Sequence, residues 1–190
     1  MSLSRCNAAL ALFALLSCGL EAPAAIDAGQ VDAGQVDAGV SAAALTSTAF
    51  ADGGVIPARH SCAGLNLSVP LSWSTVTSAQ SYAGVMTDTS INLIHWVIWD
   101  IPASVLALSE GVPNVALPPS GKQTTSYDAA TFGYLGPCPP STHTYRFELF
   151  GLDTATLPGV TTASSRAQVK ASIASHQLGR TQELSGSYSP

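Results

Sequence analysis

Charged side chains are scarce in this chain of 190 residues. They make up 10% of the sequence, with seven Lys and Arg against twelve Asp and Glu, and the formal net charge is −5. No run of Lys or Arg exists to form the basic patch that nucleic-acid binding requires, so we expect no nucleic-acid partner. Hydrophobic residues make up 46%. This composition is typical of a chain that folds around a core, and the length is sufficient for one domain with appendages.

Two common catalytic motifs are also missing from the sequence. There is no Gly-x-Ser-x-Gly nucleophile motif. There is no glycine-rich phosphate loop with its lysine, so nothing supports nucleotide hydrolysis. A histidine and an aspartate could still form a general base for a weak hydrolase. The expectation is nevertheless a protein that is not an enzyme, with no catalytic residue and no cofactor.

Long hydrophobic segments are absent too. Ala8–Leu16 is an almost unbroken apolar run after Arg5, and it is too short to span a bilayer comfortably. Residues 1–17 therefore fit a signal peptide. The run ends in Leu15-Leu16-Ser17-Cys18, which resembles the lipobox of bacterial lipoproteins, where the cysteine becomes the lipidated N-terminus. We expect an exported protein of the bacterial cell envelope, anchored to the membrane through lipid on Cys18. The alternative is a secreted or periplasmic soluble form, cleaved after Ala22-Pro23-Ala24.

Residues 18–45 differ sharply in composition from the rest. Ala, Gly, Asp and Val dominate, and a short repeat begins at Asp27, Asp32 and Asp37. Calcium-binding repeats also space Asp and Gly regularly, but they stack many longer copies. A segment with so few bulky residues is better explained as a flexible tether. The folded domain is therefore expected over residues 46–190.

Within this domain, Gly and Pro separate short runs of aromatic and β-branched residues. The expected strands are Leu71–Trp73, Tyr82–Met86, Leu93–Ile101 and Tyr145–Leu152. Only Ser164–Leu178 has convincing helical periodicity, with Ser at its start and Gly179 after its end. Many strands with a few short helices, including one near the C-terminus, predict a mainly β fold, specifically a two-sheet β-sandwich.

Two histidines stand at the beginning of apolar strands. Side chains alternate between the faces of a strand. One face should therefore carry His143, Tyr145, Phe147 and Leu149. One face of the other strand should carry His95, Val97, Trp99 and Ile101. If the two strands come together, two imidazoles meet at one rim of the sandwich, beside the proline-rich loop that precedes His143.

Several motifs resemble those of a known family. They are Phe50–Pro57, Ser61–Gly64, Ser68–Trp73, His95–Pro102, and Gly136–Pro140 followed by His143-Thr-Tyr145. In this order they resemble the phosphatidylethanolamine-binding proteins (PEBP), in the bacterial branch called Raf kinase inhibitor-like. The resemblance extends from Phe50 to Pro190. It implies a β-sandwich with a small anion-binding pocket at one end.

The resemblance also implies which residues bind the ligand. The family pocket contains an aspartate, two histidines, a Gly-Pro segment and a tyrosine. The corresponding residues are Asp88, His95, Gly136, Pro137, His143 and Tyr145. Imidazoles and phenols donate hydrogen bonds to phosphate or carboxylate oxygens, and an acid can fix a histidine tautomer. We expect a small anionic ligand such as phosphate or a phosphoester. The alternative function is an inhibitor or regulatory partner of another protein, because family members are associated with kinase and protease inhibition.

The sequence departs from the family pattern near this pocket. The family commonly has Asp-Pro-Asp-Ala-Pro before its first histidine, whereas here Asp88-Thr-Ser-Ile-Asn-Leu-Ile leads to His95. Asp100 replaces a usual asparagine, and Val69 replaces a proline. Two histidines and an acid could also bind zinc, but a closed structural site normally needs four donors, so no metal is expected. His60 and His176 are interpreted as structural residues.

Two cysteines remain once the signal is removed and Cys18 is lipidated or removed. Cys62 and Cys138 form an even number in a chain sent to an oxidising compartment, and both lie in motifs where the family often carries cysteine. We expect a disulfide between them that attaches the early loop to the pocket. The alternatives are two buried thiols, or a thiolate pair that binds metal with His60 or His143.

Overall fold

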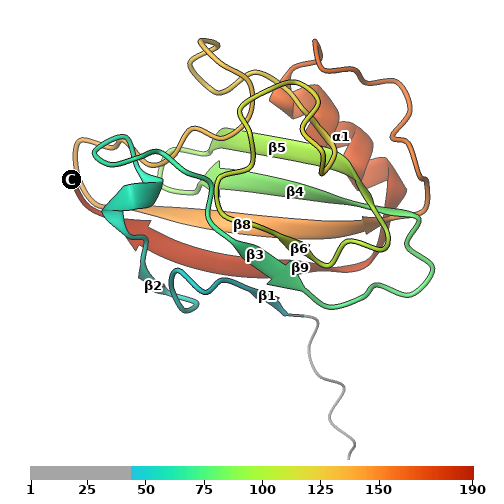
Figure 1. The fold of residues 1–190 in the computed structure, drawn as a ribbon, viewed down its shortest axis with the longest axis horizontal. Coiled ribbons are helices and arrows are strands. Elements are labelled where there is room, and N and C mark those ends of the chain that lie inside the picture. The colour runs from blue at the N-terminus through green and yellow to red at the C-terminus, as the bar shows by residue number, and fades with distance from the viewer. Residues whose placement is uncertain (1–43) are drawn as a thin grey trace, which may run out of the picture. The chain divides into compact units, whose positions relative to one another are not determined.

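The computed structural model describes residues 44–190 as two β-sheets and one α-helix (Figure 1). The larger sheet has six strands in the order β2-β9-β8-β4-β5-β7, and the smaller has three in the order β1-β3-β6. The predicted mainly β, two-sheet fold is confirmed. The predicted signal peptide, Cys18 and nearly all of the predicted tether lie outside the described residues.

Four long strands dominate the larger sheet. They are β4 (Ser81–Asp88), β5 (Leu93–Pro102), β8 (His143–Leu152) and β9 (Gln177–Tyr188). The edges are the short strands β2 (Gly54–Val55) and β7 (Lys122–Gln123). The smaller sheet contains β1 (Leu45–Thr46), β3 (Leu71–Trp73) and β6 (Ala107–Leu108). The helices are the 3-10 turn η1 (Ala58–His60) and α1 (Arg166–His176).

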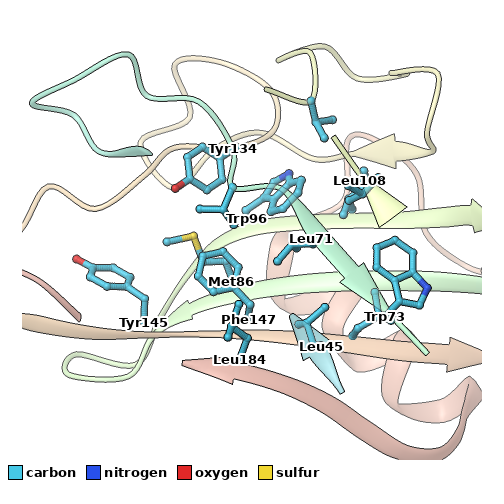
Figure 2. Packing of buried hydrophobic residues seen from close by; sticks show 14 of the residues in the cluster. Leu45, Leu71, Trp73, Met86, Trp96, Leu108, Tyr134, Tyr145, Phe147 and Leu184 are labelled. Atoms are coloured by element: carbon cyan, nitrogen blue, oxygen red, sulfur yellow. The ribbon is translucent and has the colours of Figure 1, made fainter. Parts of the chain in front are cut away.

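The main hydrophobic core fills the space between the two sheets (Figure 2). Met86, Trp96 and Phe147 reach into it from the larger sheet, and Leu71 and Trp73 from the smaller one. All five are buried. Full burial of an apolar side chain of this size stabilises the fold by about 1.5–3 kcal/mol, so this layer holds the two sheets together.

Helix α1 covers the other face of the larger sheet (Figure 1). Val169 and Ile173 are fully buried in a second cluster that includes Trp99 of β5. The predicted helix over Ser164–Leu178 is confirmed in its centre but is too long at its C-terminal end. The chain leaves the helix at once for β9, because β9 pairs with β8 from its first residue, Gln177.

Strand β5 is irregular near the end where the site lies. Met86 pairs with Trp96, and Thr87 pairs with Ile94, so His95 is the extra residue of a β-bulge. The bulge changes the alternation of side chains along the strand. It explains why His95 contacts an aromatic residue of β8 instead of pointing toward the helix.

A second irregularity in β5 lies between Ile98 and Ile101, where Asp100 has a φ of 55°. Val97 and Trp99 pack in the cluster beneath α1, whereas Ile101 packs between the sheets. The prediction that alternate residues of this strand share one face is therefore wrong. The corresponding prediction for β8 is confirmed from Tyr145 onward, because Tyr145, Phe147 and Leu149 all lie in the main core.

Candidate functional site

A cavity of about 120 Å³ lies where β4, β5 and β8 meet the proline-rich loop. Its lining includes Asp88, His95, His143 and Tyr145, four of the residues predicted to bind a ligand. The strand register brings two of them together, because Asp88 at the end of β4 pairs directly with Tyr145 of β8. Both imidazoles, of His95 and His143, line this one cavity, as the strand pattern predicted.

Asp88 holds His143 in one orientation. The Nδ1–H of His143 donates a hydrogen bond of 2.7 Å to Oδ2 of Asp88. The other oxygen of this buried carboxylate accepts a hydrogen bond of 2.9 Å from the backbone N–H of Ser90. A carboxylate bound at Nδ1 fixes the proton on that nitrogen. Nε2 of His143 is therefore the ring nitrogen that a ligand can meet.

His95 is fixed in the same tautomer by a different acceptor. Its Nδ1–H donates to the backbone carbonyl of Leu135 at 3.0 Å. The ring also packs edge-to-face on Tyr145, with 5.4 Å between centroids, and against Tyr127 at 4.3 Å. Burial lowers the pKa of His95 below its ordinary value of 6.5, although the Leu135 hydrogen bond and the charge of Asp88 oppose this effect. At neutral pH, Nε2 of His95 is an acceptor.

Tyr145 supplies a neutral hydroxyl group. Its side chain is fully buried. Burial, and after it the negative charge of Asp88, raise the pKa of Tyr145. The phenol therefore keeps its proton at every physiological pH. A hydrogen bond to Asp88 also raises this pKa, so the single hydroxyl proton can be donated either to that carboxylate or to an anionic oxygen in the cavity.

The structure corrects the predicted role of the Gly-Pro segment in the ligand site. Gly136 and Pro137 are not among the residues that line the cavity; Cys138, Pro139 and Pro140 of the same loop take that position. The backbone N–H of Gly136 donates to Oδ1 of Asn66 at 2.8 Å, and the carbonyl of Pro137 accepts from the N–H of Cys62. A side chain at position 136 would also collide with the carbonyl of His60. The Gly-Pro pair therefore anchors the loop.

The predicted disulfide between Cys62 and Cys138 is confirmed. The two Cα atoms are 5.3 Å apart, and both residues are exposed. The bridge attaches the segment after η1 to the cavity wall. It also excludes the two alternatives for these cysteines, buried thiols and a thiolate metal pair.

The lining also contains three residues that the sequence did not indicate as part of the site: Tyr127, Ile91 and Leu93. Tyr127 belongs to a polar loop without hydrophobic periodicity, so nothing in its surroundings suggests a contact with His95. Ile91 remains 59% exposed at the cavity. The cavity is thus lined by both polar and apolar side chains.

The remaining histidines lie elsewhere. His60 is buried, and its Nδ1 pairs with the carbonyl of Leu67 at 2.9 Å. His176 pairs with Asp153 at 2.8 Å near the end of α1. Neither lines the cavity. Within residues 44–190 no group of three or more His, Cys, Asp or Glu is arranged to hold a metal ion.

Comparison with known proteins agrees with this fold. Residues 46–189 match the model of the family described as phosphatidylethanolamine-binding protein. The chain belongs to this family, as its motifs predicted. Among the described residues no helix is both long and apolar enough to cross a membrane.

Relatives come from archaea and bacteria. The chain is 40% identical over 140 residues to a UPF0098 protein of Methanothermobacter thermautotrophicus, covering 71% of this chain and 91% of the relative. It is 35% identical over 140 residues to LppC of Mycobacterium tuberculosis, named as a candidate lipoprotein, covering 70% of this chain and 67% of the relative. The structure of E. coli YbcL, described as a member of the mammalian PEBP family, superposes with a TM-score of 0.70 at 28% identity, covering 78% of this chain and 98% of YbcL.

Proposed function

We propose that this chain is an exported binding protein that holds a small phosphate-type anion between His95, His143 and Tyr145. The observation that carries the proposal is the fixed tautomer of both imidazoles. Each Nδ1 is occupied by the protein, at Leu135 and Asp88, so both rings offer Nε2 to a ligand. The phenol of Tyr145 adds a donor in the same cavity.

The proposed ligand carries a proton into the site. No Lys or Arg is found among the residues that line the cavity, and the only carboxylate there is bound to His143. Neutral His95 accepts a hydrogen bond, and the Tyr145 hydroxyl donates one. A phosphate monoanion, which has both a P–OH donor and P–O⁻ acceptors, matches this mixed set. A fully deprotonated anion matches it only after His95 takes up a proton.

Binding is proposed here, and not catalysis. Of the residues that line the cavity, Cys138 is the strongest nucleophile by type, and it is held in the disulfide. Burial raises the pKa of Tyr145, so its phenolate is not available either. A weak hydrolase would have to use an imidazole of the cavity, either as the nucleophile or as the base that activates a water molecule.

The location we propose is the cell envelope, with lipid attached to Cys18. Support comes from the lipobox-like sequence before Cys18 and from the similarity to LppC, whose name marks it as a candidate lipoprotein. A single lipid-modified cysteine that carries several acyl chains gives stable membrane anchoring. The binding domain would then face the compartment outside the cytoplasmic membrane.

The test is calorimetric titration with inorganic phosphate. Replacing His95 and His143 together by Ala removes two hydrogen-bonding groups to a charged ligand, each contributing about 1.5–3 kcal/mol. The affinity should fall by about 100-fold or more. His176→Ala, which changes a partly exposed histidine outside the cavity, is the matched control and should bind like the wild type.

Sulfate is the control ligand for phosphate, because it has the same shape but carries no proton at neutral pH. Phosphate should bind more tightly than sulfate at neutral pH, and the difference should shrink on acidification as His95 becomes protonated. Unchanged phosphate affinity in the double variant would place the anion site elsewhere. Equal affinity for both anions at neutral pH would contradict the role of the ligand proton.

A further inference from the structure

Arg166, the first residue of α1, lies outside the cavity but contacts both segments that carry its aromatic wall. We propose that Arg166 is a positioning residue, whose guanidinium fixes the backbone on which His95 and Tyr127 stand and so sets the geometry of the ligand site. Its effect on affinity depends on the function proposed above. Its effect on the two rings can be measured without any ligand.

The hydrogen bonds of Arg166 connect two parts of the chain. Nε donates to the carbonyl of Ile94 at 2.8 Å. Nη1 donates to the carbonyls of Thr125 at 2.9 Å and Ser126 at 2.5 Å. Ile94 directly precedes His95 in the bulge of β5, and Ser126 directly precedes Tyr127. One side chain therefore holds the backbone next to each of the two contacting rings.

The Tyr127 segment has little other regular structure. It follows β7, and its only ladder contact outside the named strands is the bridge between Thr125 and Phe132. Ser126 and Asp128 bond to each other within the loop. These contacts lie within the loop, so the position of Tyr127 relative to His95 must come from a longer-range contact. The guanidinium of Arg166 provides one. The planar guanidinium presents its N–H donors in a rigid fork that fixes the separation of two segments, whereas a lysine ammonium is a compact charge on a flexible stem.

Arg166 is also at an unfavourable place for helix stability. The N-terminal end of a helix repels positive charge, and here the first helical residue is an arginine without an acidic residue in the first turn. The helix start is secured separately by a capping box between Ser165 and Gln168. Arg166 is thus not needed to begin α1. Its position is explained by the three carbonyls that it binds.

The positive charge of Arg166 also acts on the imidazole of His95. The charged groups that act on His95 are Asp88, Arg166 and His143, while the phenols of Tyr127 and Tyr145 contact the ring. Arg166 lowers the pKa of His95, in addition to the larger effect of burial. Loss of the guanidinium removes this repulsion, and loosening of Tyr127 reduces burial. Both changes raise the pKa of His95.

The experiment compares Arg166→Gln and Arg166→Lys with Lys170→Gln. Lys170 lies one turn further along α1, where it pairs with Glu148 at 2.7 Å and does not contact the cavity wall. NMR measures the contact between the Tyr127 and His95 rings and the titration midpoint of His95, and calorimetry measures phosphate affinity. The full domain is used, with circular dichroism to confirm folding.

In Arg166→Gln we expect the Tyr127–His95 contact to be lost and the His95 midpoint to rise. Phosphate binding should weaken by about tenfold, the effect typical of residues that orient a ligand-binding histidine. Arg166→Lys retains a positive charge, so its midpoint should move less, but affinity should still fall because a compact ammonium on a flexible stem lacks the rigid fork of donors that joins the two segments. It also serves as the test if the glutamine variant does not fold. Lys170→Gln should match the wild type in the ring contact, the His95 midpoint and the phosphate affinity.

A double-mutant cycle with Tyr127→Ala separates positioning from general destabilisation. If Arg166 acts through Tyr127, Arg166→Gln should weaken phosphate binding much less in the Tyr127→Ala background. Fully additive effects, or an unchanged ring contact and midpoint in Arg166→Gln, would overturn the proposal. If the wild type binds no phosphate, the proposed function fails, and the ring contact and midpoint still decide the role of Arg166.

Discussion

The buried imidazole of His95 makes stability depend on pH. Burial lowers its pKa below 6.5 in the folded protein, whereas in the unfolded chain it titrates near about 6.5. Between these two values the unfolded state binds more protons, so the free energy of unfolding falls as the pH falls through this window. The stabilisation is fully present above the unfolded-state pKa. We expect a His95→Asn variant to lose less stability on acidification than the wild type.

Urea denaturation at a series of pH values between about 8 and about 5 measures this difference. Asparagine retains an N–H donor for the carbonyl of Leu135 but does not titrate. His176→Asn is the control, because His176 lies in a partly exposed pair with Asp153. Identical pH dependence in the wild type and His95→Asn would show that this imidazole is not the acid-sensitive group.

Asp100 of β5 stands where the family usually has an asparagine, and the structure shows how the added charge is compensated. Its φ of 55° lies in the left-handed region, which Asn and Asp both tolerate. Oδ1 accepts from the N–H of Leu157 at 2.8 Å, and Oδ2 pairs with Nζ of Lys122 at 2.8 Å. The sequence showed the change from asparagine. It did not show the compensating lysine, which is 22 positions away and meets Asp100 only through the pairing of β5 with β7.

At the scale of elements, periodic apolar residues allowed β4, β5, β8 and α1 to be predicted. Strand β9 was not predicted, because Gly, Ser and Gln interrupt its hydrophobic pattern. Its pairing with β8 along most of its length holds it in place. The bulge at His95 had no sequence signal either, because a bulge depends on the register with β4. The motifs correctly indicated the two histidines that line the cavity, but they also indicated Gly136 and Pro137, which do not line it. Tyr127 had no sequence signal, because the packing of its loop brings it to the cavity.

The disulfide closes a large loop between two elements of the site. Cys62 and Cys138 are separated by 76 positions. A cross-link over a loop of this length restricts the unfolded chain and stabilises the fold by about 4 kcal/mol at most. Replacing both cysteines by Ala should lower the free energy of unfolding by up to this amount. It should also weaken phosphate binding, because Cys138 belongs to the cavity wall.

Equilibrium denaturation in urea compares the double variant with the oxidised wild type. Reduced wild type is the matched control, since it lacks the bond but keeps both sulfur atoms. It should resemble the double variant. Equal midpoints for the oxidised and reduced wild type would contradict a stabilising role for the bridge.

At the scale of the whole molecule, the proposed lipid anchor determines where the binding domain works. Cys18→Ser should move the protein from the detergent phase to the aqueous phase, because the acyl chains are lost. Cys6→Ser is the matched control, since Cys6 lies within the expected signal peptide, and this variant should stay in the detergent phase. Intact-mass analysis provides the second measurement. An unmodified N-terminus at Ala25 would establish the secreted form.

Together with the proposed export, the exposed disulfide implies an order of events in the maturation of the chain. In a reducing cytoplasm Cys62 and Cys138 are free thiols. The wall segment is then held to its neighbours by hydrogen bonds alone, including those from Gly136 to Asn66 and from Tyr134 to His60. On the proposed export route, oxidation follows translocation, and the disulfide joins the cavity wall to its neighbours outside the cytoplasmic membrane. A protein that follows this proposed route would bind its anion outside the cytoplasmic membrane, where the disulfide is formed.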